Sequence, residues 1–132
     1  RISAGVFGAT VDVLVSPQHR VLVTGWQAEL YYGESEVLVP AHALVNGTTV
    51  CRVPCDIITY VHVMFDRHQL IFSSGLVSES FLPGAEAITG ITKASAEELF
   101  SLFPNLRDHP ESYGPGVRTI RTATEGALIS AV

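Results

Sequence analysis

From Thr10 to Phe72, apolar and polar residues alternate in short runs separated by turn-forming Ser-Pro, Gly and Asn-Gly sequences. Alternation of period two is typical of strands with one buried face, and frequent turn residues keep such strands short. The pattern therefore predicts a β-rich body of many brief segments. The predicted strands are 10–15, 20–24, 29–32, 36–39, 48–53, 57–65 and 68–72.

Two regions have a helical pattern instead. Residues 40–45 predict a single helical turn, and the pattern changes again after Pro83-Gly84. Residues 95–104 predict a short helix with Ser95 as N-cap and Pro104 as its end, followed by a polar loop over 105–116. A further helix is predicted within 117–131. The expected fold is mostly β, followed by one or two short helices.

The composition fits one folded domain. The chain has 132 residues, of which 47% are hydrophobic and 16% charged, and a chain of this size can bury a core of its own. We expect a single domain over 1–132, with a β-rich body at 1–84 and a helical and loop extension at 85–132.

The charge excludes two classes of partner. The net charge is −5, and lysines and arginines do not cluster, so neither nucleic acid nor an anionic membrane surface is an expected partner. No apolar run reaches the ~18 residues of a membrane span, and no signal peptide is visible. The sequence starts at Arg1 without an initiator Met, so we expect a segment upstream of it.

Cys51 and Cys55 lie four residues apart around Pro54. In an extended strand their α-carbons would be ~13 Å apart, beyond the ~7 Å limit for a disulfide. Only a sharp turn at Pro54 would let them pair. We therefore expect two free thiols, with a disulfide as the alternative.

Two stretches carry candidate chemistry. In Val-Ser-Pro-Gln-His, Ser16 and His19 flank a Pro-induced bend, so a hydroxyl and an imidazole can point at one peptide group. In the second stretch, His62, Asp66 and His68 would share a face of a continuous strand by period-two alternation. A turn at Asp66-Arg67 would remove that shared face.

Taken together, these stretches resemble a family. The order SPQHRVLV, EVLVPAHALVNG, YVHVMFDRHQLIFSSGLVSESFLPG, LFPNL and YGPGVR is similar to the middle and C-terminal part of the Hint (hedgehog/intein-type) domain, in its bacterial hedgehog-type form. Ser16 and His19 match the family's Thr-x-x-His turn. Tyr60 and His68 match a later motif in which His follows Tyr by eight residues, although Val61 stands where inteins have Asp.

The resemblance implies autoprocessing by an acyl shift. The first residue of a Hint domain attacks the carbonyl before it, and the amide becomes a thioester or ester that water or another nucleophile resolves. An amide resists this attack unless its nitrogen is protonated and the bond is held in a strained geometry. The resemblance implies His19 as the acid, Ser16 as its support, and His68 with Asp66 as the groups that stabilise or resolve the intermediate.

The sequence departs from the family at its start. The family's nucleophile lies several strands before the Thr-x-x-His turn, and Ser3 is too close to His19 to take its place. We therefore expect the N-terminal strands and the nucleophile upstream, and an inactive isolated chain. The chain also lacks a terminal His-Asn pair, which favours N-terminal cleavage over splicing.

The sequence leaves a metal site as one alternative. A metal site would need Asp66 and His68 with a remote ligand such as His19 or His42, since His62 would lie ~20 Å from His68 on a regular strand. A second alternative is a non-catalytic β-rich binding or scaffold module. Expected partners are the chain's own upstream segment and a second copy of itself. We expect no cofactor, and water as the acyl acceptor. The resemblance favours a secreted bacterial protein.

Overall fold

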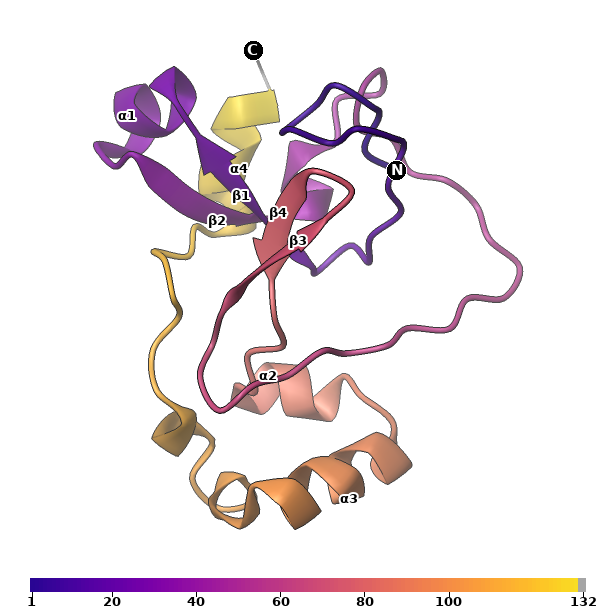
Figure 1. Cartoon of the computed structure of the whole chain (residues 1–132), viewed down its shortest axis with the longest axis vertical. Helices are drawn as coiled ribbons and strands as arrows, with labels where there is room; N and C mark the ends of the chain where they lie inside the picture. The colour runs from indigo at the N-terminus through magenta and orange to yellow at the C-terminus, as the bar shows by residue number, and fades with distance from the viewer. Residues whose placement is uncertain (131–132) are drawn as a thin grey trace. The chain divides into compact units, whose positions relative to one another are not determined.

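The protein consists of two compact units, as described by a computed structural model over residues 1–130 (Figure 1). The first unit contains residues 1–61, 70–79 and 118–130, and the second contains residues 62–69 and 80–117. Each unit is thus assembled from stretches far apart in the sequence. The prediction of a single domain, with a β-rich body at 1–84 and a helical and loop extension at 85–132, stays a prediction.

The first unit is built on a four-stranded antiparallel sheet in the order β2-β1-β4-β3. Its strands are β1 (Arg20–Thr24), β2 (Glu36–Pro40), β3 (Leu70–Ser73) and β4 (Leu76–Glu79). β1 pairs with β2 along its whole length, and β4 joins β1 at the pair Val21–Ser78. Strands β1 and β2 are buried along most of their length, which explains their continuous runs of Val and Leu.

Helix α1 (Trp26–Tyr32) corrects the strand predicted over 29–32. Burial along it follows a helical period, because Ala28 is fully buried whereas Leu30 is 68% exposed. A strand would bury these two side chains on the same face. Gly33 ends the helix in the left-handed region, with a φ of 69°, and its N–H bonds the Glu29 carbonyl.

Helix α4 (Ala123–Ser130) confirms the helix predicted within 117–131. It begins with a capping box, because the Thr122 N–H donates to the Glu125 carboxylate at 2.8 Å and the Glu125 N–H donates to the Thr122 hydroxyl at 3.3 Å. The bonds from Thr122 hold the pKa of Glu125 below its usual value. Gly126 lets α4 pack closely on strand β2, since a β-carbon there would lie 2.5 Å from Val39.

The core of the first unit forms where α1, α4 and the helical turn η1 (Ala41–Leu44) pack on the sheet. This turn confirms the one predicted over 40–45. The buried cluster consists of Ile2, Ala9, Val21, Val23, Ala28, Val37, Val39, Ala43, Leu44, Val50, Leu76 and Ile129.

The second unit contains the predicted helix 95–104, which forms as α3 (Lys93–Leu102) and so starts two residues earlier. Thr92 is its N-cap in place of Ser95, and the Thr92 hydroxyl accepts from the Ser95 N–H at 3.2 Å. The remaining helical segments are α2 (Ala85–Thr89), η2 (Pro104–Leu106) and η3 (Pro110–Tyr113). Two short helical turns therefore occupy the predicted loop 105–116.

Besides residues 29–32, three other predicted strands are wrong. Residues 57–65 contain no strand, and 10–15 and 48–53 contribute only the isolated bridges of Val13 and Val50 to Ile2. Side chains favour extended backbone in all three, but a strand also requires a neighbour with matching hydrogen bonds. Strand β4 was not predicted. The described residues are 32% helical and 17% strand, so the mostly-β prediction is not supported.

Candidate functional site

Ser16 and His19 lie at the two ends of one tight turn, which leads directly into β1. The His19 N–H donates to the Ser16 carbonyl at 3.1 Å. Pro17 fixes one φ inside the turn, so the bend predicted from the sequence is present. The His19 imidazole and the Ser16 hydroxyl therefore belong to the two residues that this hydrogen bond joins across the turn.

The turn η1 holds the Ser16–His19 turn from the other side. The Pro17 carbonyl accepts from the His42 N–H at 3.0 Å, and the His19 carbonyl accepts from the Ala41 N–H at 2.9 Å. His42 Nδ1 also lies 2.8 Å from the Pro17 carbonyl oxygen. Because a carbonyl can only accept, His42 Nδ1 carries a proton. His42 therefore anchors the turn through two bonds to one oxygen.

A buried ion pair anchors the residue that follows His19. Glu79 on β4 accepts from the Arg20 backbone N–H at 3.0 Å, and its two oxygens accept from the Arg20 guanidinium at 3.2 and 3.0 Å. The Glu79 side chain is only 8% exposed. Charge-assisted bonds of this kind are shorter and stronger than neutral ones. The backbone at the start of β1 is thereby bonded across the sheet.

The two other predicted site residues, Asp66 and His68, belong to the second unit. His68 is 3% exposed, and its Nδ1 accepts from the Val117 N–H at 2.9 Å. That nitrogen therefore carries no proton, so the neutral ring has its proton on Nε2. Asp66 is exposed, at a bend with Arg67. The bend removes the shared strand face of His62, Asp66 and His68, and the His62 ring instead packs against Phe81 at 4.8 Å.

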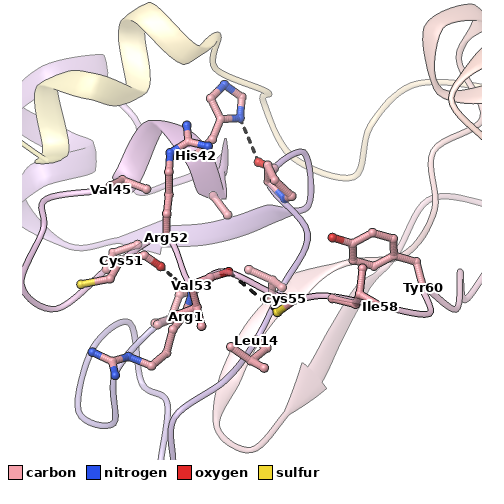
Figure 2. Close-up of a pocket in the computed structure, with 15 residues that line it drawn as sticks. Arg1, Leu14, His42, Val45, Cys51, Arg52, Val53, Cys55, Ile58 and Tyr60 are labelled. Carbon is pink, nitrogen blue, oxygen red and sulfur yellow. Dashed lines mark hydrogen bonds between the residues drawn. The ribbon is translucent and has the colours of Figure 1, made fainter.

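The first unit contains a cavity of about 290 Å³ beside the Ser16–His19 turn (Figure 2). Apolar side chains form much of its wall, and His42, Arg52 and Tyr60 add polar groups. No carboxylate is among its lining residues. These are Arg1, Ile2, Leu14, Val15, Pro17, Ala41, His42, Val45, Val50, Cys51, Arg52, Val53, Cys55, Ile58 and Tyr60.

Cys51 and Cys55 both line this cavity, and both are free thiols. The Cys51 thiol points to the Thr48 carbonyl at 3.2 Å, and the Cys55 thiol to the Val53 carbonyl at 3.8 Å. The expectation of two free thiols is confirmed, and the alternative of a disulfide is wrong.

The metal alternative has no support in the described residues. Among residues 1–130, no three His, Cys, Asp or Glu side chains gather in a group that could hold a metal ion.

Helices in the same part of the chain are all too short or too polar for a membrane span.

Sequence reasoning missed Glu79, Arg20 and His42 as parts of this site. Arg20 and Glu79 are 59 positions apart, and only the pairing of β1 with β4 brings them together. The sequence held one weak signal for Glu79. A carboxylate at the end of an apolar strand needs a hydrogen-bonding or charged partner if that strand is buried.

One comparison with known proteins identifies the family. A family model of the Hint domain matches residues 1–85, which is 85 of the 132 residues. The chain therefore belongs to the Hint domain family. No curated protein and no solved structure matches the chain significantly. The family match covers the Ser16–His19 turn and Glu79 in the first unit, and Asp66 and His68 in the second.

Proposed function

We propose that this chain is the middle and C-terminal part of a bacterial hedgehog-type Hint domain, and that the domain cleaves the peptide bond at its own N-terminal junction. The observation that supports this most is the Hint match over residues 1–85, which includes the histidine turn. Autoprocessing is the activity expected of such a domain, and the turn supplies a proton donor at a fixed place.

The proposed reaction is an acyl shift. The thiol or hydroxyl of a Cys, Ser or Thr upstream of Arg1 attacks the carbonyl carbon of the residue before it. The carbon–nitrogen bond breaks as His19 delivers a proton to the leaving nitrogen and takes up the proton of the attacking thiol or hydroxyl, and a thioester or ester forms. Water then attacks the new acyl group and releases the N-terminal fragment as a carboxylate. Proton delivery matters because an amide nitrogen is a poor leaving group unless it is protonated.

The bonds around the turn support the role of His19. Its own N–H, its carbonyl and the next backbone N–H are all bonded, to Ser16, Ala41 and Glu79. A backbone fixed on both sides limits the positions that the imidazole can reach, and fixed geometry is what makes a proton donor efficient. Ser16 supports the turn through its carbonyl.

His68 and Asp66 are the second part of the proposal. His68 is buried and its ring is held by the bond from the Val117 N–H, and a histidine positioned in this way can stabilise the charge of a tetrahedral intermediate. Asp66 is exposed and has no such constraint. We therefore assign the stabilising role to His68 and the assisting role, activation of water, to Asp66.

The test uses the parent protein with its upstream segment. Intact mass spectrometry follows self-cleavage with and without a strong thiol, because a thiol resolves a thioester or ester. We expect thiol to accelerate cleavage and His19→Ala to slow it by roughly 10²–10⁴-fold, the usual contribution of general acid catalysis.

His109→Ala is the matched control, since His109 is an exposed histidine in the second unit, with a 71% exposed side chain. It should cleave at the wild-type rate. Equal rates for wild type and His19→Ala would remove His19 from the reaction. No cleavage in any condition would favour the alternative, a Hint domain that serves as a binding or scaffold module.

A further inference from the structure

Residues 1–3 form the middle of a small antiparallel arrangement. Ile2 exchanges backbone bonds with Val13 on one side, at 2.8 and 2.9 Å. Arg1 exchanges bonds with Cys51 on the other side, at 2.8 and 3.0 Å. Ile2 also bridges to Val50, which sets the same register. Residues 1–3 therefore act as a central strand whose successive residues bond alternately to the two sides.

This register extends beyond Arg1. On one side the ladder continues from Val13 to Val15, and on the other from Cys51 to Val53, because antiparallel bonding repeats every two residues. Within residues 1–130 the N–H groups of Val15 and Val53 bond no protein acceptor. Two unpaired donors thus face a strand position that no described residue occupies.

The cavity lies at this position. Leu14, Val15 and Pro17 line it from one ladder, and Cys51, Arg52 and Val53 from the other. Figure 2 shows Arg1 bonded to Cys51, with Arg52 and Val53 continuing from that pair along the cavity. The cavity is therefore a slot between two strand edges, open where the strand of residues 1–3 would continue.

We propose that this slot binds an extended polypeptide strand, namely the residues that immediately precede Arg1 in the parent protein. Backbone groups of the first added residue would pair with Val15, and those of the second with Val53. Strand addition of this kind satisfies unpaired backbone donors, and apolar pockets beside it take alternate side chains. The exposed Arg52, with no carboxylate in the lining, favours an acidic side chain opposite it.

Prolines set the length of the slot. Pro17 has no N–H, and its carbonyl already accepts two bonds from His42. On the other edge, Pro54 follows Val53 and also lacks a donor. Regular pairing is therefore limited to about two residues before Arg1, and the second of them lies opposite Ser16.

The strand-binding proposal rests on the proposed function, because the strand in the slot belongs to the upstream segment that carries the nucleophile. A strand in the slot would bring the upstream polypeptide to Ser16 of the histidine turn. The slot would then hold the segment that joins the nucleophile to this chain, close to His19, which follows Ser16 by three residues.

Amide exchange measured by NMR tests the proposal without relying on cleavage. The chain 1–132 is compared with the same chain carrying its native upstream residues, both with His19→Ala so that the junction stays intact. His19→Gln serves as a second non-cleaving variant if the first unfolds. We expect exchange of the Val15 and Val53 amides to slow at least about tenfold in the longer protein.

The amides of Val13 and Cys51 are internal controls, because both are already bonded in the short chain. They should exchange slowly in both proteins. Unchanged exchange at Val15 and Val53 would overturn the strand-binding proposal. Protection in a parent protein whose wild-type form never cleaves would support the slot and reject the acyl shift, so the two proposals fail separately.

Discussion

At the residue scale, the feature with the largest expected effect is the Arg20–Glu79 pair. Three bonds join these residues, and Glu79 is nearly buried whereas the Arg20 side chain is 30% exposed. Replacing Glu79 leaves a partly buried guanidinium and a strand N–H without this charged acceptor. Losing one partner of such a pair costs more than the pair itself contributes.

Glu79→Gln should therefore lower the free energy of unfolding by about 1–3 kcal/mol, measured by urea denaturation of the chain. Glu97→Gln is the matched control. Glu97 pairs with Arg107 at 3.0 Å, but both side chains are more than half exposed, so this change should stay within about 0.5 kcal/mol. Equal unfolding midpoints for the two variants would contradict the importance given to the buried pair.

The sequence predicts residues that act locally and misses those that act across the fold. Ser16 and His19 were predicted as a pair because three residues and a proline bring them together. Glu79 was not, because its role depends on the pairing of β1 with β4. The roles assigned to His19, Ser16, His68 and Asp66 stay predictions until cleavage is measured.

At the element scale, Gly126 decides how closely α4 packs on the sheet and η1. Gly inside a helix normally costs about 0.5–1 kcal/mol relative to Ala, so Gly→Ala usually stabilises. Here a β-carbon would lie 2.5 Å from a Val39 methyl group and 2.9 Å from the Ala43 β-carbon. Those atoms belong to a packed core, which resists such displacement.

Gly126→Ala should therefore destabilise the protein by about 1–3 kcal/mol, measured as a lower melting temperature. Gly90→Ala is the control, because its β-carbon would lie 3.5 Å from the nearest atom with an ordinary φ of −82°. It should leave the melting temperature unchanged or slightly higher. A more stable Gly126→Ala protein would show that α4 does not pack as described.

The elements also show why strands were overpredicted. Residues 57–65 have the side chains of a strand, yet Ile57 and Val61 are 92% and 84% exposed and the segment pairs with nothing regular. Residues 29–32 have strand-forming tyrosines, but burial of Ala28 and the left-handed Gly33 produce a helix. The β-propensity of a side chain shows that it is compatible with a strand, but contacts with the rest of the fold decide whether a strand forms.

At the scale of the whole molecule, the sequence predicted the family more fully than the architecture. The order of short motifs indicated a Hint domain, and the family match over residues 1–85 confirms it. The division into two interleaved units was not predicted, because the second unit combines residues 62–69 with residues 80–117. Such a division depends on contacts between residues far apart in the sequence, and the alternation of apolar and polar residues does not indicate these contacts.

The acyl shift is the central claim, and trapping its intermediate tests it most directly. Hydroxylamine attacks a thioester or ester but spares ordinary amides, so it converts the acyl intermediate into a hydroxamate on the released fragment. The measurement is the mass of the N-terminal fragment from the parent protein, treated with hydroxylamine at neutral pH, beside the His19→Ala protein. We predict a C-terminal hydroxamate from the wild type and little from His19→Ala. A fragment that carries only a carboxylate, formed equally by both proteins, would contradict the acyl shift and the role of His19.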